Sequence, residues 1–296
     1  MMFPFSVHIL DIIGSSIGLL FVSTKPGLPS FEKDFTTLED PLIILKRGYK
    51  VAFVIGVCGF IFISYMFLST DIADSWMCYA ICGIIGAVIS YLFLECTQYY
   101  TDYNNKPVKR IVYASKTGHG TNIISGVSVG LESTGLPILI ICVGLISAFY
   151  IGEASGIINK RGERIGGLFG TAIATMGMFT TAVFILSMSG FGPIADNAGG
   201  IVEMSNQDET VRSITDRLDA VGNVTKANAK GYSVGSASLA CFLLFSAFID
   251  EVNLISPTKL DNIDITKPEV FVAGLLGSTT VFVFASWAIA AVGNAA

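Results

Sequence analysis

The strongest constraint on the fold of this chain is a series of long apolar stretches separated by polar loops. Crossing the hydrocarbon of a bilayer as a helix takes roughly 20 mostly apolar residues. About seven stretches of the 296-residue sequence meet this requirement, and Lys, Arg, Asp and Glu collect almost entirely between them. The stretches run approximately over 3–22, 51–69, 77–97, 136–156, 165–189, 231–250 and 269–292.

The composition agrees with a membrane protein and excludes an ordinary soluble domain. Apolar residues make up 52% of the chain and charged residues 14%, whereas soluble domains carry about 25% charged residues. The alternating segments of about ten residues that mark a membrane β-barrel are missing. We therefore predict an all-α integral membrane protein, a polytopic helical bundle in which residues 1–296 form a single membrane domain.

The distribution of Lys and Arg predicts how the chain is oriented in the membrane. The loops after the first, third and fifth stretches are richer in basic residues, so the positive-inside rule places them in the cytoplasm and the N-terminus on the opposite side. The richer loops contain Lys25, Lys33, Lys46, Arg47, Lys50, Lys106, Lys109, Arg110, Lys116, Arg212, Arg217, Lys226 and Lys230, and the opposite loops contain Lys160, Arg161, Arg164, Lys259 and Lys267.

A polar stripe precedes the sixth apolar stretch. Its residues follow one another at spacings of 3, 4, 3 and 4, which on an α-helix places them within an arc of roughly 80°. They are Asp216, Asp219, Asn223, Lys226 and Lys230. Charged side chains directed into a bundle usually mark an ion or substrate path. A solvated helix with acid–base pairs one turn apart is the alternative interpretation.

A second polar string follows the fifth apolar stretch and favours the interpretation as a site. Asp196 and Glu203 are seven residues apart, and therefore lie on one side of a helix, with Asn197 and a Gly-Gly pair between them. Carboxylate and amide oxygens are ligands that Mg²⁺ prefers together with phosphate oxygens. Lysines alongside would neutralise phosphate charge. The two strings together predict a magnesium–polyphosphate site, without specifying the phosphate compound.

A third polar segment, Lys-Thr-Gly-His-Gly-Thr-Asn at 116–122, contains glycines but no phosphate-binding loop. Its spacing departs from G-x-x-x-x-G-K-[ST], and no strand precedes it. We predict a turn before the fourth apolar stretch.

At these strings the chain resembles the membrane-bound, ion-translocating inorganic pyrophosphatases. The resemblance is carried by Asp-Asn-Ala-Gly-Gly-Ile-x-Glu-Met at 196–204 and by Asp-x-x-Gly-Asn-x-Thr-Lys-Ala-x-x-Lys-Gly-Tyr-x-x-Gly-Ser-Ala at 219–237. Tyr-Tyr-Thr-Asp at 99–102, with Pro107 after it, and Thr-Gly-x-x-Thr-Asn at 117–122 match more weakly. The resemblance covers nearly the whole chain and corresponds to the central portion, the seventh to thirteenth of the family's sixteen spans.

The resemblance implies a homodimeric helical bundle that hydrolyses pyrophosphate with Mg²⁺ on the cytoplasmic side and exports H⁺ or Na⁺. It implies Asp196 as the catalytic carboxylate, and Asp196, Asp219, Asn223 and Lys230 as substrate- and metal-binding residues, with Asp196 and Asn223 on the metal. Lys226 implies the potassium-independent type, because Ala at this position accompanies potassium activation in the family. The expected partners are therefore pyrophosphate, the transported ion, the lipid bilayer and a second copy of the chain, with no nucleic acid.

The chain also departs from the family pattern. The family's Asp-Asn-Val-Gly-Asp and Gly-Asp-x-x-Gly-Asp-Pro blocks do not occur, Gln98 stands where many members have Glu, and Val224 and Ala229 replace a more usual Thr. We therefore expect a fragment of a pyrophosphatase, or a gene piece that has lost activity, and no hydrolysis by residues 1–296 alone.

Two other functions stay open at this point. An ion-coupled secondary transporter would use the polar stripe to coordinate ions only, and a catalytically inactive membrane subunit would use it for packing. Release of phosphate from pyrophosphate separates the pyrophosphatase from both.

Overall fold

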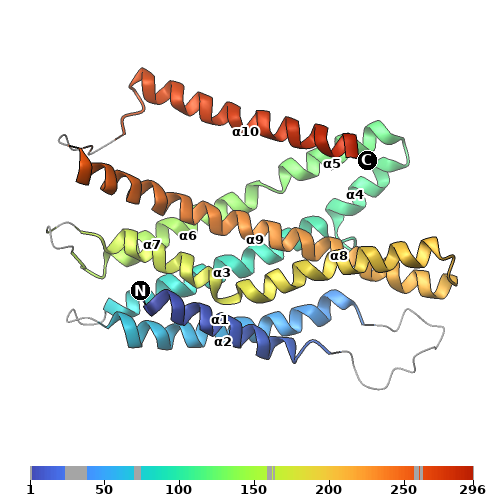
Figure 1. Cartoon of the computed structure of the whole chain (residues 1–296), viewed down its shortest axis with the longest axis horizontal. Coiled ribbons are helices and arrows are strands. Elements are labelled where there is room, and N and C mark those ends of the chain that lie inside the picture. The colour runs from blue at the N-terminus through green and yellow to red at the C-terminus, as the bar shows by residue number, and fades with distance from the viewer. Residues whose placement is uncertain are drawn as a thin grey trace. The chain divides into compact units, whose positions relative to one another are not determined.

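The computed structural model describes residues 2–23, 39–69, 75–158, 162, 164–256, 260 and 263–295, and within these ranges all regular structure is helical, apart from one isolated bridge between Ile158 and Arg164. The helices are α1 (Met2–Leu19), α2 (Pro41–Leu68), α3 (Ser75–Thr101), α4 (Lys106–Ser115), α5 (His119–Glu132), α6 (Gly135–Glu153), α7 (Gly166–Met178), the 3₁₀ turn η2 (Phe179–Thr181), α8 (Ala182–Met204), α9 (Glu209–Ile255) and α10 (Pro268–Ala295), as Figure 1 shows.

The all-α prediction is confirmed. Five of the basic loop residues, namely Lys25, Lys33, Lys160, Arg161 and Lys259, lie outside the described residues.

Seven helical runs in the described part of the chain are long and apolar enough to cross a membrane, which confirms the predicted polytopic bundle. Two compact units divide the chain, Met1–Leu244 and Phe245–Ala296. The first unit contains α1 to α8 and most of α9, and the second contains the end of α9 and α10. All the sites discussed below lie in the first unit.

The polar region between the third and fourth spans is helical rather than an extended loop. It folds into α4 and α5, which are joined by a turn at Lys116–Gly118. Gly118 has φ +132°, a backbone conformation that side chains disfavour. The predicted turn is therefore confirmed at 116–118, whereas residues 119–122 belong to the helix that begins at His119.

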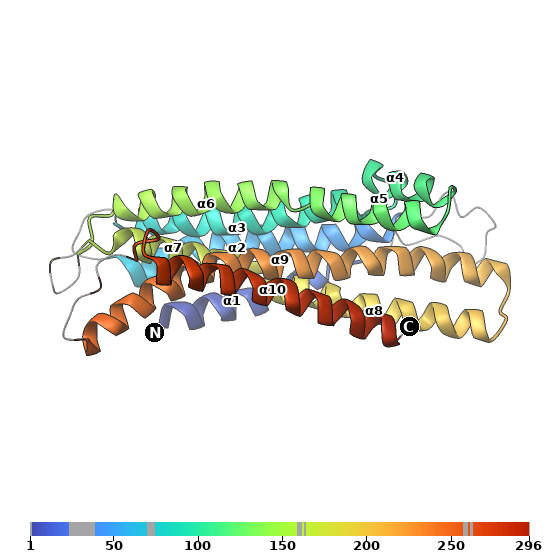
Figure 2. The same cartoon turned by 90° about the horizontal axis from the view of Figure 1, so that it is seen from above.

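The helix α9 is much longer than a bilayer requires. Its 47 residues extend about 70 Å at 1.5 Å per residue, whereas the hydrocarbon is about 30 Å thick. The part before the apolar stretch 231–250 therefore projects past the membrane, as its uninterrupted sequence predicts. Figure 2 shows this part of α9 beside the C-terminal part of α8, and side-chain contacts between the two helices agree with the view.

The expected fifth span, 165–189, is interrupted. The α-helical hydrogen-bond pattern of α7 ends at Met178, η2 follows, and α8 starts again at Ala182. The Thr180 hydroxyl donates to the Gly177 carbonyl at 2.9 Å, and the backbone N–H of Val183 donates to the carboxylate of Asp11 at 3.1 Å. A carboxylate from α1 thus satisfies a backbone donor that the interruption leaves without an intrahelical partner.

Small residues allow the helices of this unit to approach closely, as the Gly166–Gly170–Ala174 spacing predicts. A Cβ on Gly152 of α6 would lie 2.4 Å from the Gly166 carbonyl oxygen, and one on Gly86 of α3 would lie 1.8 Å from that of Ala174. Gly231 of α9 likewise meets Thr97 of α3, where a Cβ would lie 2.4 Å from the hydroxyl oxygen. The backbones are therefore in direct contact at Gly152 and Gly86, and a side chain packs directly on the backbone at Gly231.

Replacing Gly177 by alanine is expected to lower the free energy of unfolding by about 1–3 kcal/mol or more, the usual cost of overpacking. The added Cβ would lie 2.0 Å from the carbonyl oxygen of Gly83, so α3 and α7 must separate. Gly130→Ala in α5 is the matched control, because its Cβ meets nothing within 4 Å. Unfolding followed in mixed micelles measures both variants, and equal stability of the two would contradict the close α3–α7 contact.

Candidate functional site: a carboxylate–lysine cluster between α8 and α9

The two polar strings come together because α8 and α9 cross at a pair of glycines. A Cβ on Gly222 would lie 3.0 Å from the Cα of Gly192, and a Cβ on Gly192 would lie 2.6 Å from the Cγ of Lys226. The backbones therefore approach as closely as small residues allow, and the aliphatic part of Lys226 lies against Gly192. This contact fixes which side chains of the two helices can meet.

Asp196 of α8 and Lys226 of α9 form an ion pair at this crossing. The Lys226 Nζ lies 2.5 Å from the Asp196 Oδ2, and the side chains are 27% and 44% exposed. Charge-assisted hydrogen bonds are short and about twice as strong as neutral ones. Two residues predicted for the site are thus in direct contact, although the sequence placed them on separate strings.

Asp219 joins the pair through its carboxyl group. A hydrogen bond between the two carboxyls lowers the pKa of Asp196, which Lys226 lowers further, and raises the pKa of Asp219. Both residues lie outside the spans, Asp196 about 10 Å beyond residue 189 and Asp219 about 18 Å before residue 231 along their helices. Asp219 therefore holds a proton more readily than Asp196 does.

The remaining residues of the polar stripe are more exposed than the two that meet Asp196. Asp219 and Lys226 are half-buried, whereas Asp216, Asn223 and Lys230 are exposed. The stripe therefore runs along the edge of the α8–α9 contact and is not directed into the bundle. The face of α9 that is buried in the bundle lies on the opposite side of the helix from the stripe. It contains Val221, Val224, Thr225, Asn228 and Tyr232.

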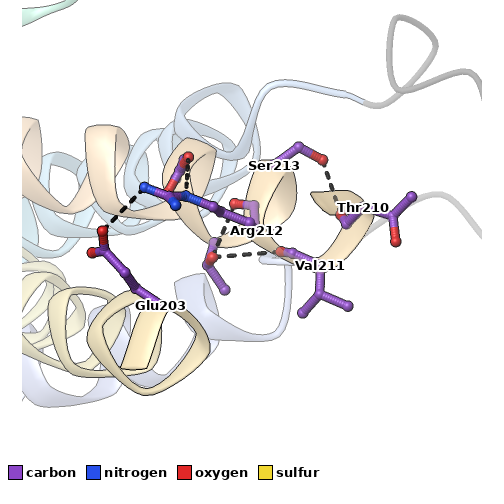
Figure 3. Close-up of polar contacts among 7 residues, drawn as sticks. Glu203, Thr210, Val211, Arg212 and Ser213 are labelled. Carbon is purple, nitrogen blue, oxygen red and sulfur yellow. Dashed lines mark hydrogen bonds and ion pairs between the residues drawn. The ribbon is translucent and has the colours of Figure 1, made fainter. Parts of the chain in front are cut away.

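Glu203, which lies on the Asp196 side of α8, pairs with a residue that the sequence analysis did not select. Figure 3 shows its carboxylate reaching the Arg212 guanidinium at 3.2 Å, and the Arg212 Nε also lies 3.8 Å from Asp216. The turn between the helices contains Asn206 at φ +50°, a conformation that asparagine tolerates. This exposed pair holds the tip of the α8–α9 hairpin and contributes less than about 1 kcal/mol.

Asn228 is a polar residue that the sequence analysis missed. It is 1% exposed, and neither amide atom has a hydrogen-bond partner among the described residues. Unpaired buried amides are rare and call for an explanation. Asn228 is two residues from Lys226 and therefore does not lie on the polar stripe. It belongs instead to a second series at helical spacing, Thr225, Asn228 and Tyr232. That spacing was the signal that could have revealed a second polar face.

The cluster can be compared with the ligands that a magnesium ion needs. In the described residues no three His, Cys, Asp or Glu side chains gather closely enough to hold a metal by themselves. Mg²⁺, however, commonly takes only one or two carboxylates and completes its shell with substrate phosphates and water. The adjoining carboxyls of Asp196 and Asp219 fit that pattern, and the exposed amide of Asn223 is one turn away from Asp219 on α9.

Together, the apolar helices and the charged cluster at their projecting ends define an integral, multi-pass membrane protein with a polar site beside the bilayer. More narrowly, the chain belongs to the inorganic H⁺ pyrophosphatase family, whose sequence profile matches residues 1–296. The family predicted from the two strings is therefore confirmed.

Named relatives agree with this assignment. The chain is 51% identical over 296 residues to the pyrophosphate-energized membrane proton pump 3 of Arabidopsis thaliana. It is 48% identical over 295 residues to the K(+)-insensitive pyrophosphate-energized proton pump 2 of Moorella thermoacetica, and 45% identical over 302 residues to a K(+)-insensitive pump of Caldanaerobacter subterraneus. These alignments take in 99–100% of the chain and 36%, 41% and 40% of the respective relatives.

Proposed function

We propose that this chain forms the central part of a potassium-insensitive proton pump that hydrolyses magnesium pyrophosphate on the cytoplasmic side of a membrane. The observation that carries the proposal is the Asp196–Asp219–Lys226 cluster at the projecting α8–α9 crossing. The names of the relatives support pyrophosphate as the substrate and H⁺ as the transported ion. The basic loops next to the cluster support its cytoplasmic placement.

In this proposal Asp196 is the general base. Its carboxylate stays ionised because Asp219 and Lys226 both donate to it, so it can orient a water molecule and accept a proton from it. Asp219 holds a proton more readily, and the two carboxyls therefore divide the roles of base and proton carrier.

The remaining proposed residues bind the substrate. Asp196 and Asn223 would hold Mg²⁺, which when bound would polarise the phosphoryl oxygens and neutralise their charge. Lys230 is exposed on the same helix, and in this proposal its ammonium group would pair with the outer phosphate oxygens. A homodimer in the bilayer completes the proposal, as the family resemblance implies.

The test is a chimera in which residues 1–296 replace the matching 295-residue portion of the Moorella thermoacetica pump. In proteoliposomes with Mg²⁺ and pyrophosphate we expect release of phosphate together with acidification of the vesicle lumen. A folded chimera that releases no phosphate would contradict the proposed function. Transport without any hydrolysis would favour the secondary transporter.

The chain alone, in the same lipid, is expected to release no phosphate above background. Two carboxyls and two lysines on α8 and α9 can compensate the charge of metal and phosphate from one side only, and a catalytic site needs compensation from several sides. Saturable phosphate release by residues 1–296 would show that this chain alone can hydrolyse pyrophosphate, and would overturn this expectation.

A further inference from the structure

A second carboxylate lies in the apolar core, away from the α8–α9 cluster. Asp11 is 1% exposed in the middle of α1, within the first apolar stretch. Ionisable residues at this depth are expensive and commonly mark an ion or proton path. The Asp196 cluster does not involve this residue, so its presence requires a separate explanation.

The contacts of Asp11 come from neutral donors. The Ser15 hydroxyl donates to its Oδ1 at 2.9 Å, and the Val183 N–H in the first turn of α8 donates to its Oδ2 at 3.1 Å. None of the described Lys or Arg side chains forms an ion pair with it. The hydrogen bonds to the ionised form thus come from neutral groups, with an added electrostatic interaction from His8 one turn away on α1. Because His8 is exposed, protonation of the carboxylate leaves no buried cation unpaired.

Two buried tyrosines lie near the interruption between α7 and α8, and one of them, Tyr232, interacts with this carboxylate. The Tyr232 hydroxyl of α9 donates to the Met178 carbonyl at 3.1 Å and interacts electrostatically with both Asp11 and Tyr49. Tyr49 of α2 is fully buried beside Ser90 and Thr181, and its hydroxyl reaches neither in normal hydrogen-bond geometry. An unpaired buried hydroxyl in this part of the core marks a place for a water molecule.

The groups that face Asp11 from neighbouring elements are few. His8 lies on α1 one turn away and contacts the ring of Phe179 in η2. Tyr49 on α2 is followed outward by Glu95 of α3, which pairs with Lys46 at 2.7 Å. On α9, Tyr232 is one turn from the unpaired amide of Asn228, on the buried face of the helix.

We propose that Asp11 is a proton-binding residue of the membrane-embedded part, which takes up one proton and releases it in each transport cycle. The inference rests on the proposed function. Uptake of the proton converts the carboxylate to a carboxylic acid and removes the negative charge that attracts the Val183 N–H. Release of the proton restores the carboxylate and its charge. Because Asp196 lies thirteen residues beyond Val183 on the same helix, about 20 Å away, protonation of Asp11 and the position of Asp196 are linked through α8.

The first test needs no enzymatic activity. Infrared difference spectra of residues 1–296 in liposomes, recorded as a pH titration, should contain a carboxylic acid C=O band that appears reversibly as the pH falls. The band should be missing in Asp11→Asn. A band that does not change with pH, or identical spectra for the two proteins, would overturn the proposal.

The second test compares transport with hydrolysis in the chimera. We expect Asp11→Asn to lower the protons transported per pyrophosphate by about tenfold or more, with hydrolysis retained, because the amide still accepts the Val183 N–H but carries no proton. Asp11→Glu should restore transport in part. Asp40→Asn is the control, since Asp40 accepts the Leu42 N–H at the start of α2 and is a helix cap only.

The outcomes separate the two proposals. If transport and hydrolysis fall by the same factor in Asp11→Asn, or if neither changes, Asp11 is a structural cap and the inference is wrong. If the unsubstituted chimera does not hydrolyse pyrophosphate, the proposed function fails by itself, and the infrared titration still decides whether Asp11 exchanges a proton.

Discussion

Asp196→Asn is expected to lower pyrophosphate turnover of the chimera by about 10²-fold or more, the scale on which a lost general base acts. The amide has the shape of the carboxylate but cannot act as a base. The substitution also removes the negative partner of the Lys226 ammonium group, which lies 2.5 Å from Asp196. Because the substitution removes a group used in the transition state, we expect kcat to fall more than KM changes. The measurement is phosphate release over a range of Mg²⁺ and pyrophosphate concentrations.

Asp208→Asn provides the control for this experiment. It removes the same charge from an exposed side chain just before α9 begins, outside the cluster, and turnover should stay near that of the unsubstituted chimera. If Asp196→Asn behaves like Asp208→Asn, the carboxylate at the α8–α9 crossing takes no part in hydrolysis, and the base must lie elsewhere in the pump.

Lys226→Ala is expected to abolish most hydrolysis in potassium-free buffer, and added K⁺ should recover it at least in part. The ammonium group is a compact monovalent charge on a flexible stem, and in this chain it lies directly on Asp196. Without it the adjoining carboxyls of Asp196 and Asp219 lose their positive neighbour, and the space beside Gly192 opens for a cation. The unsubstituted chimera should work without K⁺, in accord with the names of two of its relatives.

The test is a potassium titration of the unsubstituted chimera and of Lys226→Ala. The buffer contains neither sodium nor potassium at the start. Lys109→Ala, which removes an exposed charge from α4, should neither lose activity nor gain a response to K⁺. A requirement for K⁺ in the unsubstituted chimera would show that Lys226 does not replace the cation. The same conclusion would follow if Lys226→Ala were insensitive to K⁺.

Several features of the fold follow from local sequence and were predicted from it. The length of an apolar stretch is a property of the segment itself, so each predicted span corresponds to a helical run in the structure. The spacing of Gly166 and Gly170 likewise predicts a close helix contact wherever a partner lies, and α6 provides that partner through Gly152. The uninterrupted sequence from Asp216 into Tyr232 predicts a helix that continues past the bilayer.

The partners of the polar side chains were decided only by the tertiary structure. Helical periodicity grouped Asp219 with Lys226, but it left open the rotation of α9 against α8, and the Gly192–Gly222 crossing sets that rotation. As a result Lys226 meets Asp196, thirty residues away, while Asn223 and Lys230 are exposed.

Asp11 shows the same limit over a longer distance. The sequence places it inside an apolar stretch, where it interrupts the hydropathy. Within helical reach it offers Ser15 as a hydrogen-bond donor on one side and His8 on the other. Its other partner is the backbone N–H of Val183, 172 residues away. That N–H is available because the helix is interrupted between α7 and α8. Which donor a buried carboxylate finds depends on how distant helices pack, whereas the existence of those helices depends on the apolar length that each segment carries by itself.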